Sequence, residues 1–294
     1  MSAQHKRSNG MSRLRIVVMG AAGQLGGAVV QEFASQDVMG FTRQDVELTN
    51  HQAVLALVMD LKPDVLINCA AYNRVDDAED DVLAAIETNA FAVRSLARAA
   101  EIVKSTFVHY STDFVFDGAG ETPYLETDQP NPRSVYGVSK LLGEWFASDA
   151  PKAYVLRVES LFGGTPARSS VDRIINAILA GQEVKVFTDR TVSPSYVLDV
   201  AQATRRLVEL APDPGLYHCV NLGHGTWLDL AAHVTDLLQR KSHLCPISMA
   251  DVSLKAERPL FCALSTGKLA EAGISMPTWE DALQRHLHLR GLLA

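Results

Sequence analysis

The sequence predicts an α/β fold in which a doubly wound parallel sheet is followed by a smaller α/β cap at the C-terminal end. Apolar strand-like runs alternate with helical stretches through the first half, a glycine-rich turn follows the first run, and the alternation loosens after residue 160. Apolar strands that alternate with helices are typical of a parallel sheet covered on both faces. A chain of 294 residues with 47% hydrophobic content can bury the core that such a sheet needs.

The predicted elements of the first half are short and regularly spaced. Strands are expected at 14–19, 38–42, 65–68, 106–110 and 154–158, with helical segments at 28–33, 53–59 and 84–99. The carboxyl ends of parallel strands share one edge, and open α/β sheets bind their ligands there. The residues that follow each strand are therefore expected to form the site.

The turn after the first strand reads Gly20-Ala-Ala-Gly23-Gln-Leu-Gly26. Such glycines permit a tight turn, let main-chain N–H groups approach a pyrophosphate, and leave that anion at the N-terminus of the next helix. A glycine-rich turn with no ligand is the alternative. The position after the first strand of an α/β pattern favours a Rossmann-type dinucleotide site.

The second half is expected to contain helices at 171–180, 198–210, 227–240 and 279–289, with strands at 184–187 and 216–221. The chain then divides into a disordered tail at 1–12 and an NAD(P)-binding Rossmann domain at 13–160. Residues 161–294 are expected to be mainly a substrate-binding cap, with segments that return to the Rossmann sheet. No Pro- or Ser-rich linker separates the two parts.

Two side chains with a chemical pairing stand one helical turn apart, in Tyr136-Gly-Val-Ser-Lys140. An ammonium group near a phenol favours the phenolate, so we expect Lys140 to lower the pKa of Tyr136 and to make it a proton donor at neutral pH. The Thr112 hydroxyl, at the end of an apolar run, is expected to orient a carbonyl oxygen against that phenol. A solvated helix face is the alternative for an isolated pair of this kind.

Composition excludes several other classes. No run reaches eighteen apolar residues, and the first ten residues lack the apolar segment of a secretory signal, so no membrane partner is expected. The four cysteines show no paired or zinc-binding spacing, which indicates reduced thiols in a cytoplasmic protein. A net charge of −7 with mixed signs argues against nucleic acid as a partner.

The chain resembles the extended short-chain dehydrogenase/reductases and, among them, the dTDP-4-dehydrorhamnose reductase family. The most specific stretch is His109-Tyr-Ser-Thr-Asp-Phe-Val-Phe-Asp-Gly118, and Val75-Asp-Asp-Ala-Glu79, Gly215-Leu-Tyr-His218 and Glu257-Arg-Pro259 add to it. The resemblance spans the chain from about residue 13 to the C-terminus. It implies NADPH-dependent reduction of the 4-keto group of a dTDP-4-keto-6-deoxyhexose, with dTDP-4-dehydrorhamnose as substrate and dTDP-L-rhamnose as product.

The resemblance also implies roles for individual residues. Tyr136 would deliver the proton, Lys140 would bind the nicotinamide ribose, and Thr112 would orient the ketone. The nucleotide sugar would meet Val75, Thr112, Asp113, Tyr136, Ser160 and Arg258. The cofactor would meet Gly20, Gly23, Gln24, Leu25, Gly26, Arg43, Glu47, Leu48, Ala71, Tyr72, Asn73, Tyr110, Tyr136 and Lys140.

The sequence gives weaker signals for the choice between NADPH and NADH, for a homodimer and for a metal ion. Arg43 follows the second strand where an acidic residue would grip a ribose 2′-hydroxyl, so we expect NADPH, with NADH as the alternative because Asp45 and Glu47 lie nearby. Family members are often dimers, some with Mg²⁺ at the interface. A homodimer and a magnesium ion are therefore allowed, and no residue is assigned as a metal ligand.

Three departures from the family pattern bear on the substrate. Where the family carries a Trp near the sugar, this chain reads Arg157-Val-Glu-Ser160, so Ser160 or Glu159 is expected to face the pocket. Asn73 and Arg74 replace smaller residues, and a Gly-x-Pro-Thr of the cap appears as Val-Ser-Pro-Ser at 192–195. Two alternatives follow: a 4-ketoreductase for another activated deoxysugar, or a non-catalytic NADP-binding subunit resembling the methionine adenosyltransferase β subunit.

Two further predictions concern the remaining charged side chains and the histidines. Arg258, with Lys255 and Arg190, is expected to supply positive charge to a nucleotide diphosphate, with exposed surface positions as the alternative. His109 and His218 lie in apolar runs and are expected to be packed, hydrogen-bonded core side chains.

Overall fold

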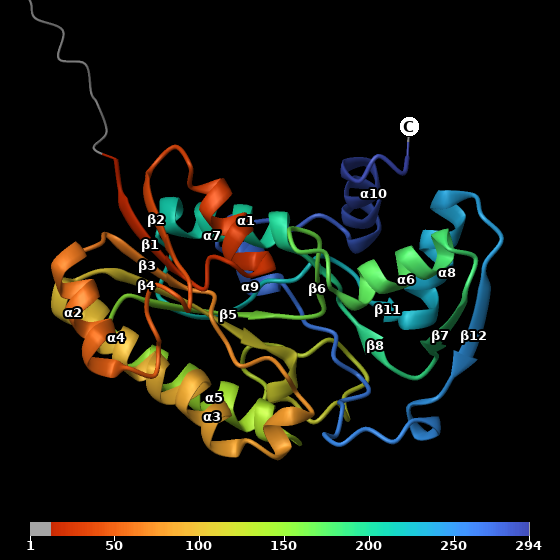
Figure 1. The fold of residues 1–294 in the computed structure, drawn as a ribbon, viewed down its shortest axis with the longest axis horizontal. Coiled ribbons are helices and arrows are strands. Elements are labelled where there is room, and N and C mark those ends of the chain that lie inside the picture. Colours follow the sequence, from red (N-terminus) through yellow and green to blue (C-terminus); the bar gives the residue numbers. More distant parts are fainter. Residues whose placement is uncertain (1–12, 294) are drawn as a thin grey trace, which may run out of the picture.

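The structure is a computed structural model that describes residues 13–293, so the tail predicted at 1–12 lies outside the described residues. Its centre is a parallel six-stranded sheet in the order β10-β5-β4-β3-β1-β2 (Figure 1). The strands are β1 (Arg15–Met19), β2 (Asp37–Phe41), β3 (Val65–Asn68), β4 (Thr106–Thr112), β5 (Ala153–Val158) and β10 (Gly215–His218). This confirms the predicted doubly wound α/β fold.

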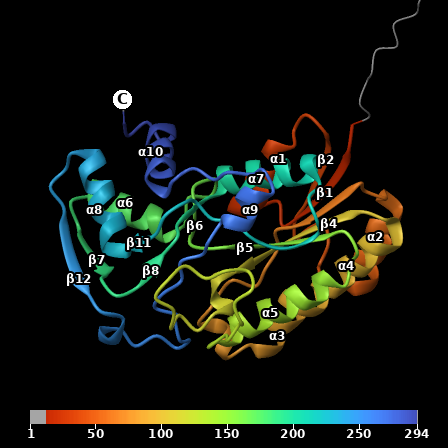
Figure 2. The same cartoon turned by 180° about the vertical axis from the view of Figure 1, so that it is seen from behind.

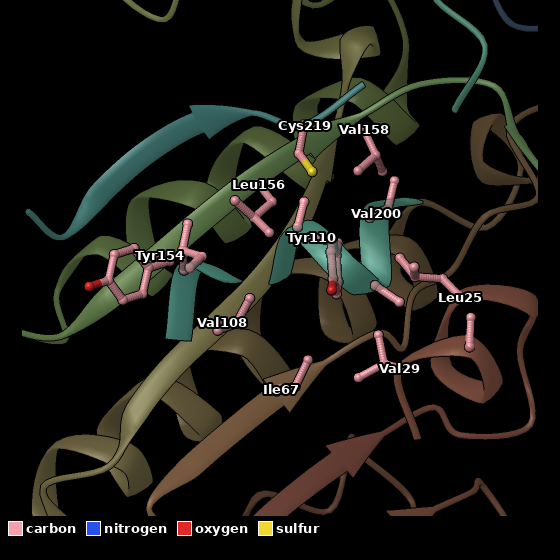
Figure 3. Packing of buried hydrophobic residues seen from close by; sticks show 14 of the residues in the cluster. Leu25, Val29, Ile67, Val108, Tyr110, Tyr154, Leu156, Val158, Val200 and Cys219 are labelled. Carbon is pink, nitrogen blue, oxygen red and sulfur yellow. The ribbon is translucent and has the colours of Figure 1, made fainter. Parts of the chain in front are cut away.

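Helices cover both faces of the sheet, as Figures 1 and 2 show from opposite sides. One face carries α1 (Gln24–Glu32) and α7 (Val197–Leu210), and the other carries α2 (His51–Leu61), α4 (Ala92–Val103) and α5 (Val135–Ser148). Figure 3 shows the core under α1 and α7, where Leu25 and Val29 belong to the same cluster of buried side chains as Val108 and Leu156 of the sheet. The four inner strands β1, β3, β4 and β5 are buried on both faces, which explains their continuous apolar runs, whereas the edge strand β2 is only partly buried.

The C-terminal part forms a smaller unit beside the carboxyl end of the sheet (Figure 1). Its core is formed by apolar side chains of α6, α8 and α10 and of the parallel pair β7–β12. The bounds are β6 (Leu161–Phe162), α6 (Ser170–Leu179), β7 (Glu183–Phe187), β8 (Thr191–Val192), β9 (Ser195–Tyr196), β11 (Gly225–Thr226), α8 (Trp227–Leu238), β12 (His243–Ile247), α9 (Gly267–Glu271) and α10 (Trp279–Leu289).

The segment that returns to the sheet is α7 with β10. Helix α7 packs on α1, and β10 pairs with β5 as the outermost strand of the sheet. The strand expected at 216–221 is therefore shorter than predicted, because the chain leaves the sheet after His218.

The single helix predicted at 84–99 is wrong. The segment is α3 (Val82–Ile86), a π-helical turn (Glu87–Phe91) and then α4. The irregular turn carries Asn89, whose side chain accepts from Tyr72 N at 2.8 Å and donates to Tyr72 O at 2.9 Å. Apolar periodicity continues through such a bulge, so it gave no signal of the interruption.

Among residues 13–293, the helices all fall short of the length and apolar character that a transmembrane span requires.

Candidate active site

The glycine turn after β1 packs more closely than any side chain would allow. Gly20 has φ +79°, and both Gly20 N and Ala21 N donate to Phe41 O, at 2.8 and 3.0 Å. A Cβ atom on Gly26 would lie 2.2 Å from Gly20 O. Helix α1 begins after Gly23, and no side chain of the described residues caps it. Its first N–H groups are thus free of side-chain caps, and the binding of a pyrophosphate there stays a prediction.

A cleft of about 920 Å³ opens beside this turn, at the carboxyl edge of β1, β2 and β3. Its size suits a dinucleotide, and the glycine turn and a backbone loop after β3 form two of its walls. The predicted cofactor residues that line it are Gly20, Gly23, Arg43, Glu47, Leu48, Ala71, Tyr72 and Asn73. These residues fit a nicotinamide dinucleotide, whose phosphates the N-terminus of α1 would hold.

The other predicted cofactor residues lie outside the lining of this cleft. Leu25 packs in the core, and the Gln24 amide donates to Gly163 O at 2.8 Å. The phenol of Tyr110 points into the core under α7 (Figure 3), where it bonds the Thr204 hydroxyl at 2.6 Å. Tyr110 therefore offers the site its main-chain carbonyl group.

Thr112 at the end of β4 interacts with Tyr136 at the start of α5, and Lys140 lies one turn further along the same helix. Ser134 caps α5 by accepting from Gly137 N at 3.1 Å, and this sets Tyr136 in the first turn. The Phe114 ring meets the Tyr136 ring edge to face, with centroids 5.5 Å apart. Lys140 is 2% exposed, and its Nζ atom donates to Tyr110 O at 2.6 Å.

The expectation that Lys140 lowers the phenol pKa is wrong for this structure. Burial raises the pKa of Tyr136 to about 12, the Thr112 hydroxyl acts in the opposite direction, and Asp113 adds to the increase. Burial also lowers the pKa of the Lys140 ammonium to about 8, against the effect of Glu144. The spacing placed both groups on α5 correctly, but it carried no information on how deeply they are buried.

A buried ion pair under Lys140 was missed by the sequence analysis. Arg157 is 1% exposed and binds both carboxylate oxygens of Glu144, at 2.8 and 2.7 Å. Ser111 donates to the same carboxylate. Glu144 stands one helical turn after Lys140, and this spacing was the available signal.

Arg43 lies at the mouth of the cleft, where a 2′-phosphate would lie in the predicted binding mode. Its side chain is 87% exposed, and Nε donates to Glu47 Oε2 at 2.7 Å. A phosphate group of a ligand would therefore have to compete with the Glu47 carboxylate for Arg43. Asp45 instead accepts from the main-chain N–H and from the hydroxyl of Thr42, so its carboxylate stabilises the turn after β2.

Of the predicted substrate residues, Asp113 follows β4, whereas Val75 and Arg258 lie in loops outside the sheet. Asp113 is 2% exposed and accepts from the Thr112 hydroxyl at 2.9 Å. Arg258 pairs with Asp76 at 2.7 Å and lies over the Phe114 ring, 5.7 Å from its centroid. Val75 is half-buried in the loop just before Asp76.

Glu159 and Ser160, which follow the end of β5, have different surroundings. Glu159 is 2% exposed and its Oε2 atom accepts from Ser193 N at 2.7 Å. Ser160 has φ +43° and its carbonyl oxygen accepts from Ser195 N at 3.4 Å. A role for the Ser160 side chain in substrate binding stays a prediction.

Of the other singled-out groups, Arg190 lies over the Phe114 ring, 5.5 Å from its centroid, while Lys255 pairs with Asp80 at the surface. His109 and His218 are fully buried, and each contacts a polar partner, which confirms that they are core side chains. Burial lowers the pKa of His218 to about 3, and Arg157 adds to this effect.

The fold and the site together define a nicotinamide-dependent oxidoreductase of the Rossmann type. The chain belongs to the family described as RmlD substrate binding domain, whose model matches residues 14–290. It is 31% identical to the dTDP-4-dehydrorhamnose reductase of Burkholderia thailandensis, over 92% of this chain and 97% of that protein. It is 35% identical to a probable dTDP-4,6-dihydroxy-2-methyloxan-3-one 4-ketoreductase of Streptomyces antibioticus, over 92% and 94% of the two chains.

Solved structures agree with this assignment. The dTDP-4-dehydrorhamnose reductase of Bacillus anthracis in complex with NADP has a TM-score of 0.90 to this chain at 30% identity, and the match covers 95% of this chain and all of that one. The corresponding protein of Clostridium acetobutylicum has a TM-score of 0.89 at 31% identity, covering 94% and 99%.

Proposed function

We propose that this protein reduces the 4-keto group of a dTDP-4-keto-6-deoxyhexose with NADPH, and that dTDP-4-dehydrorhamnose is the substrate and dTDP-L-rhamnose the product. The observation that carries the proposal is the convergence of Thr112, Tyr136 and Lys140 at the edge that also carries the dinucleotide cleft. Relatives named as reductases of this sugar match along nearly the whole chain.

Each residue has a task that its position allows. When bound, the nicotinamide supplies the hydride that reduces the ketone. Tyr136 holds the proton that goes to the ketone oxygen, and its pKa of about 12 keeps that proton in place until the oxygen becomes basic. The Thr112 hydroxyl would turn from Asp113 Oδ1 to donate to the same oxygen, and the Lys140 ammonium, fixed by Tyr110 O, would bind the ribose.

The proposal includes no magnesium ion. Among residues 13–293, the one group of side chains with metal-binding geometry is Asp113, Glu159 and Cys262, whose ligand atoms lie within 4.8 Å of one another. The Arg190 guanidinium interacts with all three, and its positive charge opposes a second cation there.

The test mixes the purified protein, NADPH and freshly made dTDP-4-keto-6-deoxyglucose, with and without a 3,5-epimerase. Loss of NADPH absorbance only with the epimerase supports the proposal. Loss without the epimerase favours the second candidate, a reductase for another activated deoxysugar, which the relative in Streptomyces antibioticus supports. No loss under either condition contradicts both and favours the non-catalytic NADP-binding subunit.

A further inference from the structure

Three polar atoms without partners lie together in a buried cluster next to the proton donor. They are Asp113 Oδ2, Glu159 Oε1 and Arg190 Nε, and in the described part of the chain none of them has a nitrogen or oxygen partner. The Cys262 thiol, a weak hydrogen-bonding group, is the one that interacts with Asp113 and Arg190. The carriers of the three atoms come from three different segments, after β4, after β5 and before β8. A buried polar atom left unpaired costs about 1–3 kcal/mol, so three of them in one place indicate a site built for a polar ligand.

The sheet register explains why the two carboxyl groups meet. Thr112 of β4 lies opposite Val158 of β5, so the next residues, Asp113 and Glu159, leave the sheet side by side. Glu159 is held from the cap by Ser193 N, and this contact directs its other oxygen toward Asp113. The cluster therefore joins the ends of β4 and β5 to the segment between β8 and β9.

The cluster is linked directly to the reacting groups. Asp113 Oδ1 accepts from the Thr112 hydroxyl at 2.9 Å, and that hydroxyl also interacts with the Tyr136 phenol. Arg190 lies over the Phe114 ring, whose edge contacts the Tyr136 ring. A group bound at the free atoms of Asp113 and Glu159 would thus lie next to a carbonyl oxygen held by Thr112 and Tyr136.

We propose that Glu159, with Asp113 and Arg190, binds the hydroxyl group on the sugar carbon next to the reacting carbonyl, and so makes this protein select sugars that carry that hydroxyl. This inference rests on the proposed function and adds the group that the pocket recognises. A hydroxyl group both donates and accepts, so it satisfies a carboxylate oxygen and a guanidinium N–H at once. In a 4-keto-6-deoxyhexose the matching group is the 3-hydroxyl, because the other neighbouring carbon carries the methyl group.

A metal ion and a structural ion pair explain the cluster less well. Arg190 already supplies a positive charge, which opposes a cation. A purely structural ion pair would direct the Arg190 fork at a carboxylate, whereas Nε, Oδ2 and Oε1 all remain unpaired.

The test compares wild type, Glu159→Gln and the matched control Glu183→Gln on two activated 4-keto-6-deoxy sugars, one with the 3-hydroxyl and one 3-deoxy. Glu183 is exposed on β7, outside the site. In Glu159→Gln the amide oxygen keeps the contact to Ser193 N, and the free acceptor becomes a donor. We expect wild type and control to prefer the 3-hydroxy sugar by about 10- to 100-fold in kcat/KM, and the variant to lose most of that preference.

Wild type alone can overturn the inference, which protects the test if the variant does not fold. Equal kcat/KM of the wild type for the two sugars contradicts it, as does an unchanged preference in a folded Glu159→Gln. Thermal unfolding of the three proteins shows whether the variant is folded. If wild type oxidises NADPH with neither sugar, the proposed function fails instead, so the two failures are distinguishable.

Discussion

Lys140 lies one helical turn beyond Tyr136 on α5, and its ammonium group donates to the main-chain carbonyl oxygen of Tyr110 at 2.6 Å. This bond fixes the ammonium at the sheet edge. Burial at that place lowers its pKa from 10.5 to about 8. The folded protein therefore releases this proton well before the unfolded chain does, which has a measurable consequence.

Replacing Lys140 with Met should change the pH dependence of stability in a defined direction. Between about pH 8 and pH 10.5 the unfolded chain holds the Lys140 proton and the folded protein does not, so wild-type stability gains with rising pH from this group. Relative to Lys140→Met, the wild-type free energy of unfolding should rise by roughly 3 kcal/mol across that window. Urea unfolding of both proteins at pH 7, 9 and 10 measures the difference, and a constant difference would contradict the assigned pKa.

Replacing Tyr136 with Phe should remove turnover and leave cofactor binding nearly intact. The phenol is the proton donor in the proposed reaction, and such a donor contributes about 10²–10⁴-fold. The NADPH dissociation constant, from fluorescence titration, should stay within a few-fold of the wild-type value. A variant that retains more than about a tenth of wild-type kcat would show that another group delivers the proton.

Two adjacent glycines of α1 give a matched test of the turn. A Cβ atom on Gly26 would lie 2.2 Å from Gly20 O, whereas one on Gly27 would lie 3.6 Å from its nearest neighbour, Ala21 O. We expect Gly26→Ala to lower both the melting temperature and NADPH affinity. Gly27→Ala should leave affinity unchanged and stabilise α1 by up to about 1 kcal/mol. Equal effects of the two changes would contradict the close packing of the turn.

Loss of one partner of the buried pair Glu144 and Arg157 should lower the free energy of unfolding much more than loss of both. Arg157→Met leaves the Glu144 carboxylate in the core without its arginine partner and with only the Ser111 hydroxyl bonded to it, which should cost about 3–5 kcal/mol in the free energy of unfolding. Removing both charges, as Glu144→Leu with Arg157→Met, should recover most of that loss. A double variant as unstable as Arg157→Met would show that lost packing dominates.

Arg43 should decide between the two nicotinamide cofactors. Its exposed guanidinium is expected to bind a 2′-phosphate once it leaves Glu47, so Arg43→Ala should weaken NADPH binding by about 10-fold and leave NADH binding unchanged. Arg98→Ala, on the exposed side of α4, is the control. Equal weakening of both cofactors would contradict this role.

Much of the site could be read from local patterns. The glycine turn, the strand-end Thr112 and the one-turn spacing of Tyr136 and Lys140 each depend on a few neighbouring residues. The structure brings these pieces to one sheet edge, because parallel strands place their carboxyl ends together. The order of β10, outside β5, could not be read in this way, since strand order depends on contacts between distant segments.

By itself, the sequence determined the α/β class, the glycine turn after the first strand and the helix that carries Tyr136 and Lys140, because each depends on periodicity or on spacing within one element. Only the tertiary structure decided the pKa values of the buried groups and the position of Glu159 beside Asp113. Burial sets the pKa of Tyr136 and Lys140, and the β4–β5 register sets Glu159 beside Asp113. Both effects arise where segments far apart in the chain exclude water together, and local sequence carries no record of that exclusion.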